Sequence, residues 1–120
     1  MNSVDKMTDR ELTVLAAQAI GIKPNLDLGG VLLDKYGGLF DPLQDDGDAL
    51  RTAVQLGFLI EIIPCEQLVI VWNSEPLNEE SKVYVRFGDL TGATADDAYQ
   101  ATRRAIVEAA ANLVFIRGKK

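Results

Sequence analysis

Histidine is absent from this chain, which therefore lacks the side chain that most often transfers protons near neutral pH. The single cysteine, Cys65, excludes an intramolecular disulfide and gives no sign of an oxidising compartment. Cys65 stands between Pro64 and Glu66, where the neighbouring acid disfavours a reactive thiolate. Since the usual arrangements for nucleophilic and acid–base catalysis are missing, we expect a protein that is not an enzyme and that uses no cofactor.

Long apolar runs and an excess of basic residues are also missing. No stretch is long enough to span a membrane, and residues 1–6 contain no apolar signal-peptide core. The net charge of −6 repels the phosphates of nucleic acids at long range. We therefore expect a cytoplasmic protein that binds neither membranes nor nucleic acids directly.

A core can nevertheless form, because 48% of the 120 residues are apolar. Aromatic residues make up only 7%, so this core must consist mainly of Leu, Ile, Val and Ala. The length predicts a single domain over residues 1–120, with residues 1–6 and 117–120 as disordered tails.

Two helices are predicted from their start and stop signals. Thr8 and Glu11 have the spacing of a capping box, and an apolar stripe runs from Leu12 to Ile20 before Gly21. A second helix is expected from Gly47 to Leu56, capped by Asp45 or Asp46 and stopped by Gly57. Its expected inner face consists of Leu50, Ala53, Val54 and Leu56.

Three strands are predicted after the second helix. Residues 58–63 and 67–72 are nearly continuous apolar runs joined by a turn at 64–66, whereas residues 82–87 alternate between apolar and polar side chains. Earlier in the chain, residues 31–36 and 39–40 flank Gly37-Gly38 and suggest a β-hairpin, with a short helix at 31–36 as the alternative. The glycine pairs are turn residues, because neither belongs to a phosphate-binding motif.

A last helix is predicted from Thr94 onward, with seven alanines between residues 95 and 111. Its expected inward stripe is Ala98, Thr102, Ala105, Ile106, Ala109 and Leu113, and its expected wet face is Gln100, Arg103, Arg104 and Glu108. The order α-(ββ)-α-β-β-β-α predicts an α+β domain. We expect an antiparallel sheet, a three-strand meander plus a hairpin, packed by the N- and C-terminal helices.

Four carboxylates within eight residues, Asp41, Asp45, Asp46 and Asp48, make the strongest candidate metal or ligand site. A helix–loop–helix calcium site counted from Asp41 would need glycine at position 46 and glutamate at position 52, and the chain has Asp46 and Thr52 there. We therefore expect these acids to cap a helix and predict no metal site, with a small-ligand or divalent-metal module in the 41–48 loop as the alternative.

Glu61 is the most unusual of the other carboxylates, because it lies in the middle of an apolar strand. We expect it to face solvent on an exposed sheet face. If it were buried, its pKa would rise unless Arg86 or Lys82 lay across the sheet from it.

The predicted strands carry more apolar surface than three modest helices readily cover. Candidates for an uncovered, partner-binding face are Leu59, Ile63, Leu68, Ile70 and Trp72. The pattern alone does not decide which side of the strands faces inward, and residues 31–41 or the second helix could cover this face within the monomer.

Residues 7–12, 41–51 and 101–107 together resemble a group of small uncharacterised proteins encoded by tailed bacteriophages and prophages. In that group an aromatic-x-Pro-Leu segment leads into Asp-Asp-Gly-Asp-Ala-Leu-Arg, and an Ala-Thr-Arg-Arg-Ala-Ile-Val helix follows near the end. The likeness spans most of residues 7–113 in order but is strong only in these three segments. Asp41 stands where Asn is common, and residues 22–36 and 64–81 do not follow the pattern. The resemblance implies a phage or prophage accessory protein that acts in the cytoplasm of its bacterial host, but it carries no catalytic residue to this chain.

We therefore expect an accessory protein that acts through protein–protein interaction, either with a host factor or as a homo-oligomer such as a dimer. A specific and less favoured form of this expectation is an inhibitor of host defence whose carboxylates mimic the phosphates of nucleic acid. The acids gather at helix starts instead of forming a long stripe, which disfavours it.

Overall fold

The computed structural model describes residues 7–25, 29, 31–33, 37–73, 82–87 and 95–118 of the chain. In this part the helices are α1 (Asp9–Ala19), α2 (Asp46–Leu56) and α3 (Ala95–Gly118). The strands are β1 (Phe58–Ile63), β2 (Leu68–Asn73) and β3 (Val83–Arg86), with a 3-10 turn at Pro64–Glu66. The predicted α+β class is confirmed, and each of the three strands expected after the second helix is found within one residue of its expected bounds.

Both predicted helix starts are confirmed by their hydrogen bonds. The Glu11 amide donates to Thr8 Oγ1 and the Thr8 amide donates to Glu11 Oε1, each at 3.1 Å, which completes the capping box. At α2 the Asp48 amide donates to Asp45 Oδ2 at 2.9 Å, and Gly57 ends the helix in the left-handed conformation with φ 70°.

The sheet is an antiparallel meander in the order β1-β2-β3. In β1 and β2, Ile60 lies opposite Val71 and Ile62 opposite Val69; in β2 and β3, Val69 lies opposite Val85. Since opposed residues of antiparallel strands point to the same side, the buried Val69 and Val71 identify the inner face.

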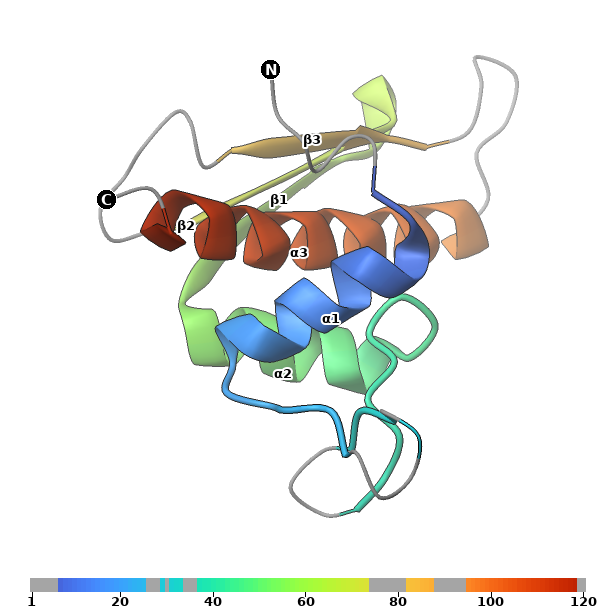
Figure 1. Cartoon of the computed structure of the whole chain (residues 1–120). Coiled ribbons are helices and arrows are strands. Elements are labelled where there is room, and N and C mark those ends of the chain that lie inside the picture. The colour runs from blue at the N-terminus through green and yellow to red at the C-terminus, as the bar shows by residue number, and fades with distance from the viewer. Residues whose placement is uncertain are drawn as a thin grey trace.

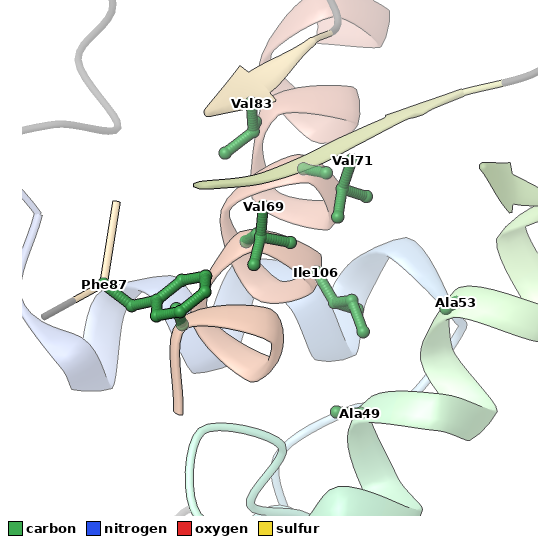
Figure 2. Packing of buried hydrophobic residues seen from close by; sticks show 10 residues of the cluster. Ala49, Ala53, Val69, Val71, Val83, Phe87 and Ile106 are labelled. Carbon is green, nitrogen blue, oxygen red and sulfur yellow. The ribbon is translucent and has the colours of Figure 1, made fainter. Parts of the chain in front are cut away.

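Helix α3 is the centre of the molecule. It packs on β2 and β3 with one side and on α1 and α2 with the other, so Figure 1 shows it between the sheet and the other two helices. Figure 2 shows Ile106 of α3 between the valines of β2 and the alanines of α2. Its opposite side, with Val107 and Ala110, packs against Leu12 of α1. A helix rich in alanine fits this position because small side chains allow close approach from every direction.

The expected inner face of α2 was partly wrong. Ala53 is buried as predicted, but Leu50 and Val54 are exposed, while Ala49 and Thr52 are buried instead. The physical reason is the position of α2 against the core around Ile106, where alanine side chains fit. The buried Thr52 hydroxyl is satisfied by a 2.8 Å hydrogen bond to the Asp48 carbonyl.

The hairpin expected around Gly37-Gly38 is reduced, among the described residues, to one antiparallel bridge between Leu33 and Leu39. The Phe40 amide supports it by donating to the Leu32 carbonyl at 2.9 Å. Residues 34–36 lie outside the described residues. The alternative of a helix beginning at residue 31 is wrong for residues 31–33, because Val31 forms a bridge with Asn25.

Helix α3 continues through Gly118 and so includes residues 117 and 118, which were expected to belong to a tail. The other predicted tail residues, 1–6 and 119–120, lie outside the described residues. None of the helices in the described ranges combines the length and the apolar character that crossing a membrane requires.

Candidate functional site

The acidic run after Phe40 is part of the framework of α2. Asp48 is only 3% exposed; its Oδ2 accepts from the Asp41 amide at 2.8 Å, and its Oδ1 accepts from Arg51 at 2.7 Å. Asp45 caps the helix, as described above. The predicted capping role of this run is therefore confirmed at Asp45, and Asp48 holds the preceding loop against the helix.

The arginines expected on the wet face of α3 are bound to other elements, which corrects that prediction. Arg103 donates from Nε to the Leu43 carbonyl at 3.0 Å and from Nη1 to Asp46 Oδ1 at 2.6 Å. Arg104 donates to Asp9 and to Glu108, each at 2.7 Å. Because α3 is central, even its polar side meets the starts of α1 and α2.

Burial alone would lower the pKa of Arg104, but the hydrogen bonds and negative charges of Glu108 and Asp9 outweigh it. The pKa is therefore raised above its ordinary value, and Arg104 stays charged over the accessible pH range. Both arginines also place positive charge beside the acidic first turns of α1 and α2. The three segments that carry the phage-protein resemblance, residues 7–12, 41–51 and 101–107, thus meet in space through ion pairs.

No group of three or more His, Cys, Asp or Glu side chains in the described ranges is arranged to hold a metal ion. Excess calcium or magnesium chloride is therefore expected to leave the thermal midpoint unchanged, because the Asp45, Asp46 and Asp48 carboxylates already accept hydrogen bonds within the protein. Differential scanning fluorimetry with EDTA as the reference measures this. A metal-dependent rise that disappears in Asp45→Ala would contradict the structural role.

A hollow of about 820 Å³ lies beside α2. The exposed Leu50 and Val54 line it together with Ile22 and Phe40, and Arg51 lies at the same hollow. The two apolar side chains that were expected in the core therefore form a wall of this surface groove. Its polar lining includes the buried Asp48, which is already engaged by the Asp41 amide and Arg51.

A second apolar surface lies on the sheet. The register places all five predicted partner-binding residues on the face of the sheet that points away from α3: Leu59, Ile63, Leu68, Ile70 and Trp72. Tyr84 of β3 lies opposite Ile70 and belongs to the same face; sequence reasoning assigned it to the polar side of β3 and missed it. Figure 1 shows the three helices on the other side of the sheet.

Charged side chains lie at two borders of this helix-free face, Glu61 on β1 and Lys82 just before β3. Glu61 of β1 is exposed, as expected, and lies opposite Ile70, not beside Arg86 or Lys82. On the other side Lys82 places its Nζ 5.1 Å from the centre of the Trp72 ring, a cation–π contact. The face thus has an apolar centre on β2 with charges at its borders.

Strand β1 is the most exposed part of the sheet. Leu59, Ile60 and Ile62 are 42%, 37% and 49% exposed, although Ile60 and Ile62 belong to the inner face. The cause is the position of α3, which packs on β2 and β3 and leaves the inner side of β1 largely uncovered. Among the described residues no strand pairs with the outer edge of β1. The exposed Cys65 lies just beyond this strand, in the turn.

Comparisons with models of protein families, with curated proteins and with solved structures return no match. A functional assignment for this chain therefore depends on the chemistry of its own surface. Two features stand out among the described residues: the helix-free face of the sheet and the open edge of β1.

Proposed function

We propose that this protein is an accessory protein of a phage or prophage that acts in the bacterial cytoplasm by binding another protein through its sheet. One observation carries the proposal: six apolar or aromatic side chains from three strands share the face that no described helix covers. They are Leu59, Ile63, Leu68, Ile70, Trp72 and Tyr84. The phage context comes from the sequence resemblance.

The composition of this face favours a protein partner over a small molecule. Protein interfaces combine an apolar centre that includes aromatic residues with a charged border, as Trp72 and Tyr84 do here with Glu61 and Lys82. A small-molecule site is usually a concave pocket that encloses its ligand, whereas this face is the surface of a three-stranded sheet.

The other candidate functions draw less support from the structure. Metal or ligand binding by the 41–48 loop competes with the capping and ion-pair contacts of Asp45, Asp46 and Asp48. Nucleic-acid mimicry needs a free row of acids, whereas Asp9, Asp46 and Asp48 pair with arginines of the same chain. An enzymatic role has no histidine to draw on, and the exposed Cys65 stands beside Glu66, which disfavours a thiolate.

Site-specific photo-cross-linking in bacterial cells tests the proposal. Tyr84 and Tyr99 are a matched pair, because each is 56% exposed, yet Tyr84 lies on the helix-free face and Tyr99 on α3. Replacing Tyr84 with photoreactive benzoylphenylalanine is expected to yield a discrete cross-linked protein. The same replacement at Tyr99 is expected to yield none. Mass spectrometry of the cross-linked band then identifies the partner.

Two results would count against the proposal. No adduct at Tyr84, or the same set of adducts at Tyr84 and Tyr99, would mean that the helix-free face has no specific partner. An adduct made only of two copies of this chain would assign the face to self-association.

A further inference from the structure

The open edge of β1 is unusual in length and chemistry. Native sheets usually protect an edge strand with lysine, proline, a bulge or a short length, because its unpaired amides and carbonyls can pair with another strand. Strand β1 has six residues, five of them apolar, and only Glu61 as a charged residue. Its central four residues, Leu59 to Ile62, are all exposed.

We propose that two copies of this chain pair through β1 in an antiparallel manner, about a two-fold axis, and form a continuous six-stranded sheet. This pairing goes beyond the proposed function, because it uses the edge of β1 and leaves the helix-free face of each copy open to another protein. A two-fold axis perpendicular to a sheet keeps equivalent faces on the same side. The uncovered inner side of β1 therefore meets the same surface of the second copy.

The direction of the backbone groups in β1 follows from one hydrogen bond. The Phe87 amide donates to the Gln67 carbonyl at 2.9 Å, while the Gln67 amide donates to the Pro64 carbonyl at 3.1 Å within the turn. Since the Gln67 carbonyl points toward β3, the amides and carbonyls of Val69 and Val71 point toward β3 as well. Residues 68, 70 and 72 then bond to 63, 61 and 59 of β1. The amides and carbonyls of Phe58, Ile60 and Ile62 consequently point to the open edge.

A register with Ile60 opposite Ile60 of the second copy uses every one of these groups. Phe58 then lies opposite Ile62 of the other copy, and the three hydrogen-bonded pairs close six backbone bonds. In this register all the inner-face pairs are apolar. Two of them join Phe58 of one copy to Ile62 of the other, an aromatic and a β-branched residue, which is a favourable cross-strand combination. The exposed Ile60 and Ile62 are thereby covered on both copies.

The neighbouring register is worse on two counts. With Glu61 opposite Glu61, two like charges would face each other directly. That register also places Phe58 opposite Pro64, which lies beyond the strand and has no amide hydrogen. Within β1 only two pairs, both between Ile60 and Ile62, could then close both of their backbone bonds, against three pairs in the favoured register. The register shifted the other way, with Leu59 opposite Leu59, likewise closes only two pairs within β1, both between Phe58 and Ile60. Self-pairing of β1 therefore has one favoured register, and this distinguishes a second copy from an arbitrary extended peptide.

The expected association is reversible and of moderate strength. Pairing two six-residue strands buries less than the roughly 1,200 Å² at which stable interfaces begin, so we expect dissociation in the micromolar range or above. The net charge of −6 on each copy adds a screened repulsion. Measurements must therefore extend to high protein concentration.

Disulfide trapping tests both the pairing and its register. In the proposed dimer Leu59 lies opposite Glu61 of the other copy, at a pair not bonded through the backbone, where side chains approach closely. A mixture of Leu59→Cys and Glu61→Cys chains, each in a Cys65→Ser background, is expected to form a mixed disulfide under mild oxidation. Its mass distinguishes it from either homodimer. Leu59→Cys mixed with Tyr99→Cys is the control and is expected to remain uncross-linked.

A second variant tests the association without cross-linking. Ile60→Lys places a charge at the centre of the pairing but at a partly exposed position, so the fold is expected to persist. Sedimentation velocity should show a monomer where the unmodified chain shows a dimer, and Ile60→Val should still dimerise.

The outcomes separate the two proposals. β1 pairing would be overturned if the unmodified chain stayed monomeric at the highest soluble concentration and the Leu59→Cys and Glu61→Cys chains formed no mixed disulfide. Preferential Glu61→Cys homodimers would overturn the register and with it the argument for self-pairing. In either case a host protein cross-linked from Tyr84 would still support the proposed function. That function has its own test, the comparison of photo-cross-linking at Tyr84 and Tyr99.

Discussion

Replacing Asp48 with alanine is expected to lower the free energy of unfolding by about 2–3 kcal/mol, the range for losing hydrogen bonds to a buried charged group. The carboxylate is almost fully buried and accepts from the Asp41 amide and from Arg51. Its removal leaves the amide without this acceptor and loosens the loop that leads into α2. Urea denaturation followed by circular dichroism measures the change.

Two further variants calibrate this result. Asp41→Ala removes an exposed carboxylate while keeping the backbone amide that bonds to Asp48, so we expect a change within about 0.5 kcal/mol. Asp48→Asn keeps one acceptor oxygen and should fall between the two. If Asp48→Ala left stability unchanged or increased it, Asp48 would be a strained functional residue instead of a structural one, and the ligand-binding alternative would return.

Enlarging the alanines of α3 is expected to be the second large effect. Ala105 faces the sheet and Ala110 faces α1, and both are completely buried. Replacing either with leucine should destabilise the protein by about 1–3 kcal/mol, because the added methyl groups force neighbouring elements apart. The thermal midpoint and urea midpoint of each variant measure this loss.

The double variant Ala105→Leu/Ala110→Leu decides whether α3 is packed on two opposite sides. We expect it not to fold cooperatively, since neither layer can move away to make room. Gln100→Leu, at an exposed position of the same helix, is the control and should have little effect, because leucine and glutamine have similar helix propensities. A double variant as stable as either single variant would mean that one of the two interfaces is loose.

Local signals predicted much of the fold. The Thr8 capping box, the Asp45 cap and the stop at Gly57 are short-range patterns whose chemistry is complete within a few residues. The three strands were likewise visible as β-branched runs. Such features depend little on the rest of the molecule, and they form where the sequence indicates.

Features that depend on which other helix or strand an element packs against were harder to predict. Leu50 and Val54 have the right spacing for a buried stripe, yet α2 turns Ala49 and Ala53 inward, toward the core around Ile106. Arg103 and Arg104 read as a solvent-facing pair because no pattern indicates that α3 is surrounded. A helix with alanine at so many positions could have suggested close packing on more than one side.

The sequence groups the residues of the candidate surface on one face of the strands, but it does not decide which face of the sheet is buried. The period of two groups Leu59, Ile63, Leu68, Ile70 and Trp72 on one side, but only the position of α3 decides that Val69 and Val71 are the buried set. The exposure of Ile60 and Ile62 has the same origin. No strand pattern reveals that a covering helix stops short of the edge strand.

The central place of α3 also bears on how the protein is made. This helix follows every other described element in the chain, and its Arg104 meets Asp9 across 95 residues. During translation α1, α2 and the β1–β2 pair leave the ribosome before the helix that joins them, with their apolar sides unburied. Few of the contacts can form early, so folding is expected to be late and concerted. A premature stop codon ahead of α3 would leave a chaperone substrate rather than a smaller folded protein.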